Sequence, residues 1–106
     1  MAVTPPPPTT AQIEAIIIGL LSRRVASSSI CPSDAARGLC KPGSAAWRAW
    51  MPLVRDVAQA MAERGVLQIT RGDQAVPKAE LQRGAIRLRR GLGFGAWRAD
   101  RNDSSV

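Results

Sequence analysis

The sequence predicts a small α+β domain in which three helices precede an antiparallel β hairpin. Apolar residues recur at helical spacing between residues 11 and 64, and later segments alternate apolar and polar residues as strands do. The chain has 106 residues, 45% of them hydrophobic, which suits a single domain with one core.

The first helix is expected over residues 11–24, with Thr10 as its N-cap. Residues 1–10 contain four consecutive prolines, which favour an extended, solvated segment, so we expect a disordered Pro/Thr tail there. The buried face of the helix would consist of apolar residues spaced three or four apart, namely Ile13, Ile16, Ile17, Leu20 and Leu21.

The second helix is expected over residues 32–40. Cys31 would be its N-cap, Pro32 suits the first helical position, and Asp34 stands where a capping box has its acid. The segment Lys41-Pro42-Gly43 would end this helix.

The third helical stretch would begin at Ser44 and end at Gly65, which suits the C′ position. Pro52 interrupts this stretch and removes a hydrogen bond, so we expect either a kink or a short helix over 44–50 followed by a new start. Both tryptophans of the stretch are expected in the core, because its apolar stripe comprises Trp47, Trp50, Met51, Val54, Val57, Ala58 and Met61.

Strands are expected in the last part of the domain. Residues 66–70 alternate, Gly72-Asp73 would form a tight turn, and residues 75–76 would return as a second strand. Residues 85–89 would form the last strand, in which Ile86 and Leu88 point inward and Arg87 and Arg89 outward. Residues 91–106 are glycine-rich and then polar, so we expect a flexible tail.

This order of elements, with a short extended contact at Ile30 between the first two helices, is that of a winged helix-turn-helix. We expect this fold over residues 11–90. The second and third helices would form the turn-helix pair, and the hairpin would be the wing.

Two sequence blocks resemble a known family. They are CPSDAAR at 31–37 and WRAWMPLVR at 47–55, with shorter similar runs at 68–70 and 84–89. In combination, as CPSDxAR and WRxxMPxVR, they resemble a bacterial family of small uncharacterised winged-helix proteins, over about residues 12–90. The resemblance implies the winged-helix fold and a bacterial origin, and it leaves the function open. Ala85 departs from the family pattern, in which proline is expected.

The net charge of +7 indicates an anionic partner. Residues 23–90 carry 13 Arg or Lys against 5 Asp or Glu, a balance of +8. Such a core would attract nucleic acid, an acidic protein surface or anionic lipid. The other interpretation is that arginine is a common surface residue here.

The first candidate site is the exposed face of the third helix. Arg48 and Arg55 are two helical turns apart, and Gln59 continues their face, which in a winged helix would enter the major groove of DNA. Structural roles are the alternative: Arg55 could pair with Asp34 or Asp56, and Arg48 could stack on a tryptophan.

The second candidate site is the wing. Outward arginines on a hairpin suit contact with DNA phosphates, although they could also form a charged edge that discourages strand-to-strand aggregation. The residues concerned are Arg71, Lys78, Arg83, Arg87, Arg89 and Arg90.

The cysteines give a third candidate. Nine helical steps of about 1.5 Å would keep Cys31 and Cys40 about 13 Å apart, whereas a disulfide needs less than about 7 Å, so we expect two free thiols. Cys31 at an N-cap could be a reactive thiol sensor or an inert cap. Trp97, beside Arg98, could stack on a base or pack back on the domain.

No catalytic, metal or cofactor site is expected. The chain has no His and no Tyr, and GLGFG does not stand between a strand and a helix as a phosphate loop does. We therefore expect a DNA-binding domain, not an enzyme, with helix three as reader and the wing on the phosphates. A protein-interaction module with an acidic partner, or a thiol sensor, is the alternative.

The sequence also bears on location and assembly. Neither a secretory signal nor an apolar run of membrane-spanning length is visible, so we expect a cytoplasmic chain without membrane contact. It is expected to be a monomer or a weak homodimer.

Overall fold

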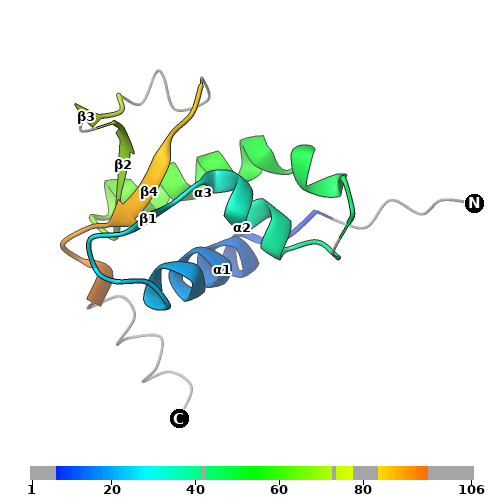
Figure 1. Ribbon diagram of the computed structural model, residues 1–106, viewed down its shortest axis with the longest axis horizontal. Helices are drawn as coiled ribbons and strands as arrows, with labels where there is room; N and C mark the ends of the chain where they lie inside the picture. Colours follow the sequence, from blue (N-terminus) through cyan, green and yellow to red (C-terminus); the bar gives the residue numbers. More distant parts are fainter. Residues whose placement is uncertain (1–6, 42, 73, 78–83, 96–106) are drawn as a thin grey trace, which may run out of the picture.

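The computed structural model describes residues 7–41, 43–72, 74–77 and 84–95, and it shows a mixed α+β fold (Figure 1). The helices are α1 (Thr10–Ser22), α2 (Pro32–Gly38) and α3 (Met51–Glu63), with a short 3-10 helix, η1 (Ala46–Arg48). The strands are β1 (Ser29–Ile30), β2 (Leu67–Arg71), β3 (Gln74–Ala75) and β4 (Arg87–Arg90).

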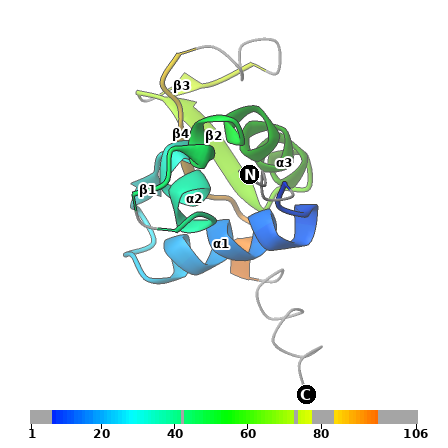
Figure 2. The same cartoon turned by 90° about the vertical axis from the view of Figure 1, so that its right-hand side faces the viewer.

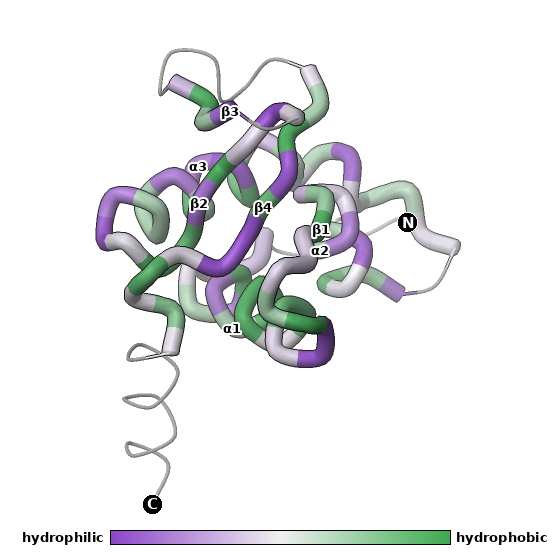
Figure 3. The backbone as a smooth tube through the Cα atoms, turned by 60° about the vertical axis from the view of Figure 1, so that its left-hand side comes forward, coloured by the Kyte–Doolittle hydropathy of each residue, from purple (hydrophilic) through white to green (hydrophobic). Residues whose placement is uncertain are grey.

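The strands form one antiparallel sheet in the order β1-β4-β2-β3. Leu88 of the central strand β4 is paired with Ile30 on one side and with Ile69 on the other. All three side chains are buried, while alternate residues of β2 and β4 are polar (Figure 3). The inward placement expected for Ile86 and Leu88 is confirmed, since both are almost fully buried.

The three helices lie on one face of this sheet (Figure 2), and the hairpin that includes β3 projects beyond them. One core joins the helices to the sheet. Its fully buried members include Ile13, Ile17, Ala35, Ala36, Val54, Ala58, Met61, Ile30 and Leu88. None of the described helices has both the length and the apolar character of a membrane span.

Helix α1 starts one residue earlier than expected. Thr9, not Thr10, is the N-cap, because Gln12 three residues later completes a capping box with it. The N–H of Thr9 donates to Gln12 Oε1 at 2.8 Å, and the N–H of Gln12 donates to Thr9 Oγ1 at 3.1 Å. The helix ends at Ser22, two residues before the expected end.

Helix α2 begins as expected and ends at Gly38, before the expected residue 40. Cys31 is the N-cap, and its N–H donates to Asp34 Oδ2 at 3.0 Å. Both cysteines are free thiols, as expected. A Cβ atom on Gly38 would lie 2.9 Å from Ile16 Cδ1, so the absent side chain allows α1 and α2 to approach closely.

Pro52 divides the third helical stretch into two elements. The short helix η1 ends at Arg48, and α3 starts afresh at Met51 with proline in its first turn, where no hydrogen bond is lost. Of the two outcomes expected for Pro52, the new start is therefore confirmed. Gly65, with φ of 80°, follows the C-cap of α3 as expected.

The division at Pro52 overturns two expectations. Arg48 and Arg55 lie on different elements, so their spacing of seven residues does not place them on one helical face. Trp47 and Trp50 are half-buried rather than fully buried, because the apolar stripe of α3 does not continue through η1; Trp47 packs against the outside of the core. The core positions on α3 are Val54, Val57, Ala58 and Met61.

The packed part of the chain extends past residue 90, into the segment expected to be a flexible tail. Phe94 is 3% exposed and belongs to the core. A Cβ atom on Gly91 would clash with the carbonyl oxygen of Gly65, so only glycine allows this close backbone approach. Trp97 lies outside the described residues.

Candidate functional site

The helix-three residues expected to read DNA take part in contacts within the protein. Arg55 is half-buried, and its Nη2 donates to the carbonyl oxygen of Gly84 at 3.0 Å. Gln59 Nε2 donates to Glu63 Oε1 at 3.2 Å, one turn further along α3. Arg55 thus links α3 to the segment that leads into β4.

The arginines of the hairpin donate hydrogen bonds to backbone carbonyls of neighbouring segments. Arg87 donates from Nε to Ser29 Oγ and from Nη2 to the Ser29 carbonyl, both at 2.9 Å. Arg89 Nη1 donates to the carbonyl of Ser27 at 3.0 Å, and Arg71 Nε donates to that of Ala85 at 3.2 Å. These hydrogen bonds hold β1 and the loop before it against β4, and they hold the segment that leads into β4 against β2. Lys78 and Arg83 lie outside the described residues.

Arg90 binds backbone carbonyls at the C-terminal end of helix α1. Its Nη2 donates to the carbonyl oxygens of Leu21 and Arg24, both at 2.8 Å, and its Cζ lies 4.8 Å from the centre of the Phe94 ring. The last carbonyls of a helix have no partner within it, and a cation there is favourable. The role of Arg90 is therefore structural.

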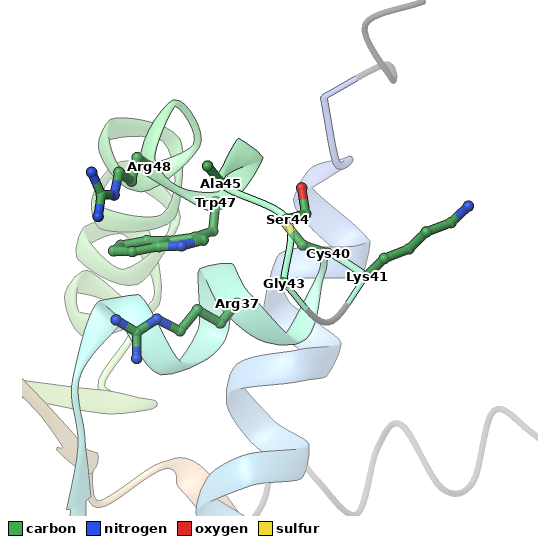
Figure 4. A pocket seen from close by; sticks show the side chains of 8 residues that line it. All are labelled: Arg37, Cys40, Lys41, Gly43, Ser44, Ala45, Trp47 and Arg48. Atoms are coloured by element: carbon green, nitrogen blue, oxygen red, sulfur yellow. The ribbon is translucent and has the colours of Figure 1, made fainter.

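A different group of cations surrounds Trp47. Arg37, in the last turn of α2, lies with its Cζ 4.5 Å from the centre of the Trp47 ring, and Arg48, at the end of η1, lies at 5.3 Å. Figure 4 shows the indole between the two arginine side chains. The stacking of Arg48 on a tryptophan, one of the two roles expected for it, is thus confirmed.

The Trp47 ring forms one wall of an open hollow of about 480 Å³ between α2 and η1. We name it the Trp47 hollow. Among the described residues that line it, none is acidic; they are Arg37, Cys40, Lys41, Gly43, Ser44, Ala45, Trp47 and Arg48. The ammonium of Lys41 points away from the two guanidinium groups (Figure 4).

The electrostatics of the hollow favour an anion. The two distances to the ring place the guanidinium carbons of Arg37 and Arg48 at most about 10 Å apart. The screening length at physiological salt is about 8 Å, so solvent ions screen much of the repulsion between these two exposed charges. Each cation gains about 0.5–1 kcal/mol from an exposed aromatic face, which keeps them in place. An anion that contacts both guanidinium groups would neutralise this local positive charge.

Sequence reasoning did not single out Arg37 or Lys41 as site residues. Arg37 is the last residue of the block at 31–37, and Trp47-Arg48 open the block at 47–55. The two blocks therefore meet at this contact. The available signal was the arginine at the end of one block and the tryptophan-arginine pair at the start of the next.

Cys31 is held in a local network. Ser33 Oγ donates to Cys31 Sγ at 3.1 Å, and Asp34 accepts the Cys31 N–H. Both contacts belong to the cap of α2. The reactivity of this thiol stays a prediction.

Comparison with known proteins gives a family over most of the chain. The model of a family described as "Protein of unknown function (DUF3253)" matches residues 10–91. This range covers every helix and strand of the described fold. No curated protein matches the chain.

Proposed function

Since this chain belongs to the DUF3253 family of proteins of unknown function, we propose its activity from its geometry: it is a winged helix-turn-helix domain that binds duplex DNA. The binding is dominated by the phosphate backbone. The domain has no catalytic role of its own.

The arrangement of elements supports the winged-helix assignment. A short strand separates α1 from α2, and α2 and α3 are joined by a connection that contains η1. The strand after α3 and the last strand are paired, with β1 on the outer side of β4. A hairpin that projects beside α3 is what a wing requires (Figure 1).

The observation that carries DNA binding is the Arg37–Trp47–Arg48 group at the connection between α2 and α3. In helix-turn-helix proteins the second helix of the pair enters the major groove with its N-terminal residues foremost. Arg48 lies three residues before the start of α3, so the group would face a phosphate strand at the groove edge.

Helix α3 and the wing complete the proposed interface. Arg55 and Gln59 on α3 would face the groove, and Arg71, Lys78, Arg87 and Arg89 would contact phosphates on the wing side. A guanidinium has five N–H donors, so an arginine that already donates to a backbone carbonyl retains donors for a phosphate oxygen. Exposed Asp56 and Glu63 on α3 disfavour close base contacts along the whole helix.

The test is fluorescence anisotropy of a labelled duplex titrated with the protein. Micromolar or tighter binding is expected near 50 mM salt, and it should weaken by about ten to a thousand times near 200 mM, because each phosphate contact releases a counterion. An affinity that does not depend on salt would contradict backbone binding.

A protein-interaction module is the second candidate, and the acids on α3 favour it. Asp56 and Glu63 are exposed on the helix that would enter the groove, and phosphates on both sides of a groove repel them, whereas an acidic protein surface can bind the basic residues without contacting α3. If this candidate holds, poly-glutamate should bind the chain at a salt concentration at which duplex DNA of equal charge does not. The reverse order supports DNA binding.

A thiol sensor at Cys31 is the third candidate, and a rate measurement tests it. A sensor thiol should react with a maleimide faster than a free cysteine at the same pH, because the thiolate is the reactive form. A rate equal to or below that of free cysteine excludes the sensor.

A further inference from the structure

We propose that Arg37 and Arg48, held on the ring of Trp47, form a phosphate clamp, and that this clamp is the main anchor of the domain on its ligand. The chemistry recognised is a phosphate group with free anionic oxygens. As an anchor for DNA the clamp rests on the function proposed above. A free phosphorylated ligand offers the same chemistry, and the experiments below distinguish the two sources.

The availability of donors separates the clamp from the other arginines. Within the described part of the chain, neither Arg37 nor Arg48 has a hydrogen bond or an ion pair, and both side chains are exposed. Arg87, Arg89 and Arg90 by contrast each donate to the backbone. No described residue therefore competes with a ligand for the N–H donors of the clamp.

The ring of Trp47 preorganises the clamp. A long arginine side chain normally loses conformational entropy when it binds, at a cost of up to about 2 kcal/mol. Stacking on the half-buried indole fixes both guanidinium groups before the ligand arrives (Figure 4). Planar guanidinium groups also match the two oxygens of a phosphate, which a lysine does not.

Ser44, which also lines the hollow, offers one more hydrogen-bond donor. Ser44 Oγ accepts the N–H of Ala46 at 3.2 Å and so caps the turn that carries Trp47. Its hydroxyl proton has no acceptor among the described residues and can be donated to an anion in the hollow. No lining carboxylate among those residues competes with the ligand.

The first experiment compares two variants of equal net charge on labelled duplex DNA. Arg37→Gln with Arg48→Gln removes the clamp, and Arg23→Gln with Arg24→Gln removes two exposed cations at the end of α1, which do not line the hollow. The clamp variant should lose about tenfold or more in affinity, and its salt slope should fall by about two. The control should lose less than about threefold.

This comparison separates the clamp from the function it rests on. Equal losses in the two variants would overturn the clamp while DNA binding by the wild-type chain stands. No DNA binding by the wild-type chain would overturn the proposed function. The clamp is then tested by the binding of pyrophosphate in the second experiment.

The second experiment uses the fluorescence of Trp47. The chain has three Trp and no Tyr, so Trp50→Phe with Trp97→Phe leaves Trp47 as the reporter. Pyrophosphate should change its emission in a saturable way, since the bound anion changes the charge beside the indole, and adding Arg37→Gln with Arg48→Gln should abolish the change. If the double Phe variant does not fold, the indole N–H signal of Trp47 in the wild-type protein gives the same readout.

The outcomes of the two experiments identify the source of the phosphate. A response to pyrophosphate without DNA binding assigns the clamp to a free phosphorylated ligand. A response to DNA with a clamp-dependent loss assigns it to the nucleic acid backbone. No response to either ligand at low salt overturns the clamp.

Discussion

Arg90 shows how one residue can serve the fold while its sequence context points to a ligand. It stands at the end of an alternating, arginine-rich strand, where an outward cation suits a phosphate. Its guanidinium instead bridges the carbonyls of Leu21 and Arg24 and stacks on Phe94. The two carbonyls are 69 and 66 residues away in sequence, so no local pattern could have revealed them.

Replacing Arg90 should destabilise the fold. Arg90→Ala removes two hydrogen bonds from a charged donor and the contact with Phe94, with an expected cost of about 2–4 kcal/mol in the free energy of unfolding. Urea unfolding followed by circular dichroism measures it. Arg23→Ala, at an exposed site, should change stability by less than about 0.5 kcal/mol and is the control.

Phe94 tests where the folded domain ends. Phe94→Ala should cost about 3–5 kcal/mol, because a buried aromatic side chain is lost from the core. A change of less than 1 kcal/mol in the same urea experiment would mean that residues 91–95 do not contribute to the fold, as the sequence alone had indicated.

At the scale of elements, local signals predicted most of the structure. The cap at Cys31, the new helix start at Pro52 and the stop at Gly65 each depend on backbone chemistry within a few residues. The partial exposure of Trp47 and Trp50 was not predicted in this way, because the helical stripe was extended through Pro52, where the helical periodicity ends. The clamp depends on a contact between two elements, which spacing alone does not show.

The cap of α2 gives a prediction at this scale. Asp34→Ala removes the acceptor of the Cys31 N–H and should cost about 1 kcal/mol of stability. Asp34→Asn retains an acceptor oxygen and should cost less. Chemical unfolding of the two variants compares them, and an equal loss would show that the hydrogen bond itself is unimportant.

At the scale of the whole molecule, the positive charge has two uses. The arginines of the sheet bond to uncharged backbone carbonyls, whereas Arg37 and Arg48, at the Trp47 hollow, form no hydrogen bond with the part of the chain that the structure describes. Net charge therefore predicts an anionic partner, but it does not predict which cations would contact that partner.

This division predicts different salt responses for folding and binding. Bonds from a cation to a neutral carbonyl need no opposite charge, and salt screens the repulsion among the excess cations. The urea midpoint should therefore stay constant or rise between about 50 and 500 mM sodium chloride, while DNA affinity falls. A midpoint that falls with salt would show that ion pairs, such as that of Arg64 with Glu14, dominate stability.

The most direct test of the clamp is a nuclear magnetic resonance titration of the wild-type protein with a short duplex. The side-chain N–H signals of Trp47, Arg37 and Arg48 report on the hollow, and the backbone of residues 23–29 reports on a face held by structural arginines. We predict that the Trp47 indole signal and the signals around the start of α3 shift first and most. Shifts confined to residues 23–29, with Trp47 unchanged at saturation, would contradict the account.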